Sequence, residues 1–109
     1  MQLVYVIKYV ADMDRAVAFH RDTLGLTPGM VSPFWSEFET GQCKLALHPA
    51  SEANPAGSCE VGLRDPELEA TYARRDELGI EFVEQPRHQH GTILARIRDS
   101  EGGSISVSG

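Results

Sequence analysis

Two stretches of the chain have the apolar spacing of an amphipathic helix. In the first, Met13, Ala16, Val17 and Leu24 fall close to the i, i+3, i+4 spacing of a helix face. Asp12 precedes this stretch as an N-cap, and Asp65 precedes the second one, where Pro66 suits a first helical turn. Gly25 and Gly79 follow the two stretches, where a left-handed residue commonly ends a helix. The pattern therefore predicts two capped helices of similar design.

Shorter apolar or alternating stretches between turn residues predict strands around these helices. One strand precedes each helix, at Leu3–Val10 and Cys59–Arg64. Three more are expected after each helix: Thr27–Ser32, Ser36–Thr40 and Lys44–His48, then Glu81–Gln85, Thr92–Arg98 and Ser104–Ser108. Each half of the chain therefore has the order β-α-β-β-β.

The two halves also share a sequence repeat. The segment His20–Leu26 reappears as Arg74–Ile80, with Arg, Asp, Leu and Gly in the same places. The halves are expected at about residues 1–48 and 59–109, joined by a linker over 49–58. Neither half has enough elements to bury both faces of its own sheet. We therefore expect one α+β domain, in which two βαβββ modules form a cup-shaped, partly closed mixed sheet with the helices outside.

Composition and charge narrow the possible partners. The chain has 109 residues, and its 16 acidic against 10 basic side chains give a net charge of −6, which disfavours nucleic-acid binding. The apolar run Leu3–Ile7 is cut by Lys8, so no membrane span is predicted, and we expect a cytoplasmic protein. Cys43 and Cys59 have no metal-binding spacing and are expected to be buried free thiols.

The paired halves, the segment Val10–Leu26 and the segment Arg98–Gly103 together resemble the vicinal oxygen chelate superfamily. Its members include glyoxalase I, bleomycin-resistance proteins, fosfomycin-resistance enzymes and extradiol dioxygenases. The resemblance covers essentially the whole chain, but its opening motif is a signature of the fold and carries no chemistry. The resemblance implies that the functional site lies in the cup.

Metal-using members of this superfamily take their ligands from four strand positions. The resemblance places Tyr5, Ala46, Glu60 and Ser106 at these positions, and only Glu60 is an ordinary metal ligand. We therefore expect no catalytic metal. A less favoured alternative is a divalent metal held by Glu60, His48 and either His88 or His90; otherwise both of these last histidines belong to a solvated loop. His20, in the first helix, is expected to be a packing residue.

Strand alternation predicts which side chains line the cup. Taking Tyr5 and Glu60 as inward-facing gives a surface of aromatic, small and charged side chains. The candidate ligand-binding residues on the strands are Tyr5, Ile7, Tyr9, Ala46, His48, Glu60, Arg64, Arg96 and Ser106. Trp35 and Phe38 are expected either to stack on a planar ligand at the rim or, in the case of Trp35, to anchor a dimer.

These features favour a dimeric, metal-independent protein that binds a small molecule, with sequestration of an aromatic compound or antibiotic as the first function. The alternative is a lyase or isomerase in which Glu60 is the general acid or base, because a partly desolvated carboxyl group has a pKa suited to proton transfer. A third class is a structural dimer without a ligand. Metal analysis and a screen of aromatic compounds discriminate among the three.

Overall fold

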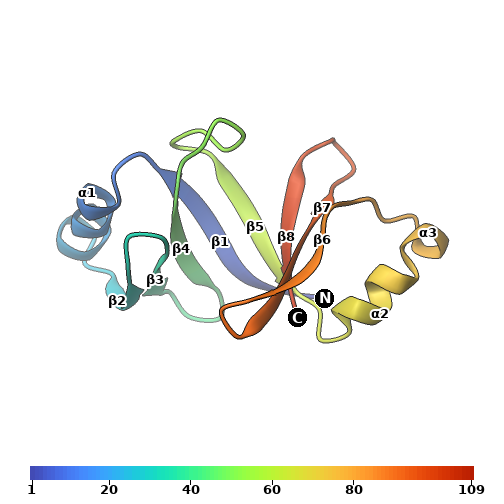
Figure 1. Cartoon of the computed structure of the whole chain (residues 1–109). Coiled ribbons are helices and arrows are strands. Elements are labelled where there is room, and N and C mark those ends of the chain that lie inside the picture. Colours follow the sequence, from blue (N-terminus) through green and yellow to red (C-terminus); the bar gives the residue numbers. More distant parts are fainter. The chain divides into compact units, whose positions relative to one another are not determined.

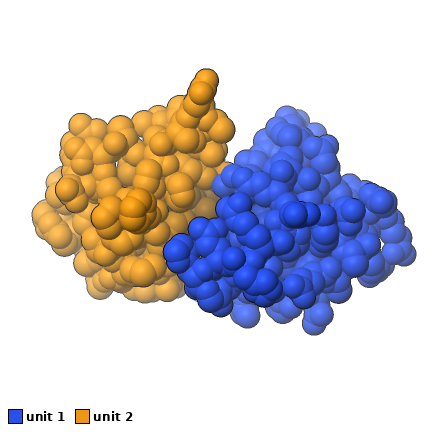
Figure 2. Space-filling model, viewed as in Figure 1, with its two compact units in different colours: residues 1–3, 61–109 blue, residues 4–60 orange.

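The computed structural model describes all of residues 1–109 and divides into two compact units. The N-terminal unit comprises Val4–Glu60, and the C-terminal unit comprises Met1–Leu3 and Val61–Gly109 (Figure 2). Both are built from strands and short helices, which confirms the α+β class and the two βαβββ modules. The cup-shaped closure stays a prediction.

The first module carries four strands and a two-part helix (Figure 1). Its elements are β1 (Gln2–Val10), α1 (Met13–Ala18), the π-helical turn η1 (Phe19–Thr23), β2 (Thr27–Val31), β3 (Ser36–Glu39) and β4 (Lys44–Pro49). The strands lie in the order β2-β3-β4-β1, with β1 parallel to β4 and the other pairs antiparallel.

The second module repeats this plan. Its elements are β5 (Cys59–Arg64), α2 (Leu68–Ala73), α3 (Arg75–Leu78), β6 (Phe82–Gln89), β7 (Thr92–Arg98) and β8 (Ser104–Ser108). The order is β5-β8-β7-β6, with β5 parallel to β8. The bounds of β5, β7 and β8 are those predicted, and the other strands differ only at their ends.

The helix boundaries follow local hydrogen bonding. The Asp12 carboxylate accepts a hydrogen bond of 3.1 Å from the Arg15 backbone N–H, which confirms the predicted N-cap. Asp65 instead accepts one of 2.9 Å from the Glu67 N–H, and α2 begins only after this turn. The structure therefore corrects the predicted N-cap at Asp65. Gly25 and Gly79 have φ angles of 71° and 73°, as expected for residues that end a helix in the left-handed region.

The apolar core of the N-terminal unit lies between α1 and one face of its sheet. Val17, Phe38 and Leu47 are buried there, with partly buried neighbours that include Val10 and Leu45. Phe38 is fully buried, and its ring stacks on His20 with the centroids 5.5 Å apart. His20 also makes a 2.7 Å hydrogen bond through Nδ1 to the Ala16 carbonyl oxygen, so it is a packing residue as predicted.

The C-terminal unit has an equivalent core beneath α2. Its buried members are Leu68, Ala95, Ile97 and Val107. Tyr72 joins the helices to β6, because its ring meets the Phe82 ring edge-to-face at 4.9 Å and the Arg75 guanidinium lies over it at 4.2 Å. None of the helices has the length and apolar content needed to span a membrane.

Two predictions about individual residues are wrong. Cys43 is half-buried and Cys59 is exposed, although both are free thiols, so neither is the buried residue that was expected. The strand β6 continues to Gln89 and includes His88, so the predicted loop is reduced to a tight turn at His90. The exposed His88 ring lies 3.8 Å from the Glu69 carboxylate.

Candidate functional site

The register of β1 on β4 gives the N-terminal unit two different faces. Tyr5, Ile7 and Tyr9 pair with Lys44, Ala46 and His48, in that order. Because side chains alternate along a strand, these six share one face, opposite the core under α1. Ile7, Tyr9 and Ala46 are buried there, with Tyr5 and Trp35 packed against them. This arrangement confirms the predicted alternation on both strands.

Four rings line this side of the sheet, and we call Tyr5, Tyr9, Trp35 and His48 the aromatic face. Tyr5 meets Trp35 edge-to-face with ring centroids 5.3 Å apart, and Tyr9 meets His48 at 5.4 Å. Trp35 and His48 are 6.3 Å apart, which links the two pairs. Edge-to-face geometry is the favoured arrangement of neighbouring rings, so the four rings support one another.

Glu37 holds the aromatic face in place. Its Oε1 accepts hydrogen bonds from the Tyr5 hydroxyl at 3.0 Å and from the Trp35 indole N–H at 2.9 Å. Its Oε2 accepts a charge-assisted hydrogen bond of 3.1 Å from the Lys44 ammonium group. With three donors converging on one carboxylate, the orientations of Tyr5 and Trp35 depend on Glu37.

The pKa values of this cluster follow from those contacts. Burial by itself raises the pKa of Glu37, but the hydrogen bonds from Trp35, Lys44 and Tyr5 together hold it below its usual value. The pKa of the Tyr5 phenol is raised, first by burial and then by its hydrogen bond to the Glu37 carboxylate. Tyr5 is therefore a protonated donor, and Glu37 is its anionic acceptor.

Glu37 was not among the residues selected from the sequence. The signal lies in the pairing of β3 with β4, where Glu37 stands opposite Ala46 and Phe38 stands opposite Leu45. Since Ala46 belongs to the aromatic face and Leu45 to the core, the two neighbours on β3 point to opposite sides. The structure therefore places Phe38 in the core under α1 and does not bring it together with Trp35.

Glu60 is the second carboxylate of the unit. It is buried, and its Oε2 accepts a hydrogen bond of 3.1 Å from the Tyr9 hydroxyl. The Tyr9 backbone helps to fix this end of β1, because its N–H donates to Ser58 O at 3.0 Å and its carbonyl accepts from Gly57 N at 2.9 Å. Tyr9 thus connects the aromatic face to a buried acidic group.

The remaining candidate residues belong to the C-terminal unit. Arg96 stands opposite Ser106 in the pairing of β7 with β8, and Ser106 stands opposite Gly62 on β5. The three share the sheet face opposite the apolar core of that unit. The Arg96 guanidinium lies 3.1 Å from the Glu84 carboxylate. Arg64, at the end of β5, is exposed.

The superfamily resemblance assigns four positions of this chain to metal ligands, and the side chains found there are poorly suited to bind a metal. Ala46 is buried and has no donor atom. The raised pKa of Tyr5 keeps its phenol protonated, and the proton is directed at Glu37. The structure contains no group of three or more His, Cys, Asp or Glu side chains arranged to hold a metal ion. The residues present therefore do not fit the metal site that the superfamily commonly uses.

Comparison with solved structures shows the fold. A Legionella pneumophila protein, an NAD-dependent benzaldehyde dehydrogenase, aligns with a TM-score of 0.77 at 15% identity, covering 95% of this chain and 96% of that chain. Methylmalonyl-CoA epimerase from Mycobacterium tuberculosis aligns with a TM-score of 0.77 at 20% identity, covering 98% and 86%. A superfamily member from Vibrio splendidus 12B01 aligns with a TM-score of 0.67 at 14% identity, covering 98% and 96%.

Comparison of sequences gives the family. No curated protein matches the chain. The sequence pattern of the Glyoxalase/Bleomycin resistance protein/Dioxygenase superfamily matches residues 2–107, which is nearly the whole length. The chain therefore belongs to the Glyoxalase/Bleomycin resistance protein/Dioxygenase superfamily.

Proposed function

We propose that the protein binds a planar aromatic compound against the aromatic face and sequesters it. The observation that carries this proposal is that the Tyr5 hydroxyl and the Trp35 indole N–H both donate hydrogen bonds to Oε1 of Glu37. Rings fixed before the ligand arrives lose little conformational freedom when it binds, which favours affinity. Both rings are only half-buried and His48 is exposed, so each retains surface for contact with a ligand. An aromatic antibiotic has the shape and the apolar surface for such a site.

The first prediction concerns the rings themselves. A thermal-shift screen of aromatic antibiotics should identify a ligand, and Tyr5→Ala or Trp35→Ala should weaken its binding about ten- to a hundredfold in a calorimetric titration, the usual cost of losing a stacking or hydrogen-bonding contact. Phe34→Ala is the matched control, because Phe34 is 77% exposed and lies outside the aromatic face. Unchanged affinity in both ring variants would place the ligand elsewhere.

The second prediction concerns Glu37. A carboxylate with a lowered pKa stabilises the folded state above its ordinary pKa, and this contribution is lost as the pH falls through the folded-state value. Glu37→Gln should therefore unfold more easily than wild type at pH 7, by about 1–3 kcal/mol. The difference should shrink as the pH is lowered to about 3.

Urea unfolding at the two pH values measures this difference. Glu39→Gln is the control, since Glu39 is an exposed neighbour whose carboxylate forms a 3.6 Å ion pair with the same Lys44. If both variants lose the same stability at both pH values, Glu37 is not the group that holds the aromatic face.

We also propose that binding requires no resident metal, on the basis of the donor chemistry at Tyr5 and Ala46. Protein purified without chelator and then dialysed should contain far less than one equivalent of zinc, nickel, iron or manganese by mass spectrometry. About one equivalent would contradict the proposal. In that case release of the metal by both His48→Ala and Glu60→Gln would support the alternative site.

A second candidate function is proton transfer by Glu60, and the buried Tyr9–Glu60 hydrogen bond favours it. In this scheme Glu60 removes a proton from carbon and returns one, as a lyase or isomerase requires. A methylmalonyl-CoA epimerase is among the structures with the same fold, so methylmalonyl-CoA is a reasonable first test compound. Deuterium should enter its C2 position in D₂O with wild type and not with Glu60→Gln. No incorporation above the buffer rate with wild type would reject this candidate for that substrate.

We also propose that the protein is a cytoplasmic homodimer. The strand β2 is at the edge of its unit's sheet, and Met30, Val31 and Phe34 are exposed on it or just beyond it. The two free thiols suit a reducing compartment. Sedimentation at micromolar concentration should give twice the chain mass of 12.0 kDa, and a mass of one chain throughout would refute the dimer.

A further inference from the structure

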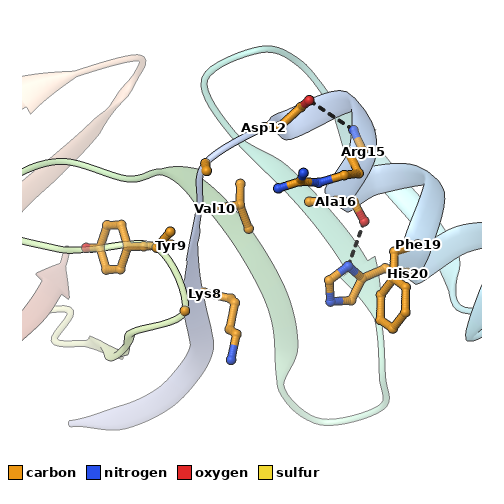
Figure 3. A pocket seen from close by; sticks show the side chains of 11 residues that line it. Lys8, Tyr9, Val10, Asp12, Arg15, Ala16, Phe19 and His20 are labelled. Atoms are coloured by element: carbon orange, nitrogen blue, oxygen red, sulfur yellow. Dashed lines mark hydrogen bonds between the residues drawn. The ribbon is translucent and has the colours of Figure 1, made fainter.

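A pocket lies on the side of β1 opposite the aromatic face. It has a volume of about 520 Å³ and is open to solvent, between the end of β1, one side of α1 and η1, and the loop at Ala56 and Gly57 (Figure 3). Its apolar lining consists of Val10, Ala11, Ala16, Phe19 and Ala56. This volume is within the range of small-molecule sites.

Two cationic side chains lie at this pocket, one from each wall. Lys8 comes from β1, and the Arg15 side chain extends from α1 toward β1 (Figure 3). Neither the Lys8 ammonium group nor the Arg15 guanidinium has a hydrogen bond or an ion pair within the protein. The one acidic side chain of the lining, Asp12, is engaged in capping α1. The lining therefore keeps a net positive charge, with two cationic side chains against one carboxylate and neither cation in an ion pair.

Alternation along β1 separates this pocket from the aromatic face. Lys8 and Val10 alternate with Ile7 and Tyr9, and the Tyr9 ring points away from α1 on the other side of the strand (Figure 3). Phe19 offers an aromatic surface to the pocket and is 49% exposed. The pocket thus combines an exposed ring, small apolar side chains and two unpaired cations.

We propose that this pocket binds a small organic anion, one with a flat apolar body and a carboxylate or sulfonate group. The apolar body would lie against Phe19, Ala16 and Val10, and the anionic group would accept hydrogen bonds from Arg15 or Lys8. Charge-assisted hydrogen bonds of this kind are stronger than neutral ones, and Arg suits a carboxylate in particular. The site shares only Tyr9 of β1 with the aromatic face, and it does not depend on the proposed function.

Three naphthalene compounds of different charge test the proposal on the full chain. Naphthalene-2-sulfonate, the neutral 2-naphthalenemethanol and the cationic 2-naphthylmethylammonium ion are titrated separately into ¹⁵N-labelled protein. Dissociation constants come from the amide resonances of Ala16 and Ala56, which line this pocket and lie outside the aromatic face. The sulfonate should bind at least tenfold more tightly than the other two, and added salt should weaken it.

Variants of the two cationic residues then test whether the tighter binding of the sulfonate arises in this pocket. Lys8→Met and Arg15→Met combined should weaken sulfonate binding about tenfold or more, whereas Trp35→Ala should not change it. Arg21→Met is the matched control, because Arg21 is exposed on η1, pairs with Asp22 at 2.8 Å and does not line the pocket. Equal binding of the three compounds, or an equal loss in Arg21→Met and the double variant, would overturn the proposal.

Discussion

The parallel pairing of β1 with β4 determines the chemistry of the N-terminal unit. It places Tyr5, Ile7 and Tyr9 beside Lys44, Ala46 and His48, and it turns Val10, Leu45 and Leu47 toward α1. A shift of one residue in this register would exchange the two sets and bury charged side chains in the core. Because the helix side is filled by Val17, Phe38 and Leu47, such a shift is strongly disfavoured, and the rings are left for the other face.

Glu37 converts this set of rings into a defined surface. A buried carboxylate is unfavourable unless donors satisfy it, and here the Tyr5 hydroxyl, the Trp35 indole and the Lys44 ammonium group do so. The same contacts direct the Tyr5 proton inward and fix the plane of Trp35. A position that the superfamily resemblance associates with a metal ligand is thus occupied by a hydrogen-bonded phenol, which is why we favour binding over metal-dependent catalysis.

Much of the fold was predictable because it depends on local signals. The Asp12 cap, the glycines at positions 25 and 79 and the alternation in β1, β4 and β8 are short-range features, and the glycine at the helix end recurs in both halves. The position of Phe38 and the role of Glu37 were not predictable in the same way, because they depend on the register of β3 against β4. No local pattern in the short strand Ser36–Glu39 shows which of its neighbouring side chains faces the core.

The exposed Cys59 has a similar explanation. A strand pattern predicts alternation, but it does not show whether a residue at the first position of a strand is covered by another element. Cys59 begins β5 and is exposed, whereas its neighbour Glu60 is buried because it turns toward Tyr9. A carboxylate in a buried position and a thiol in an exposed one reverse the usual preferences, and the hydrogen bond from Tyr9 helps to account for the buried carboxylate.

The most direct test of this account is a set of nuclear Overhauser effects between the tightest aromatic ligand found by screening and the ring protons of the protein. The account predicts contacts from the ligand to the rings of Tyr5 and Trp35, with further contacts to the exposed ring of His48. Contacts confined to Phe19, Val10 and Ala16 would show that the ligand occupies the pocket beside α1, and would contradict the assignment of the aromatic face as the principal binding site.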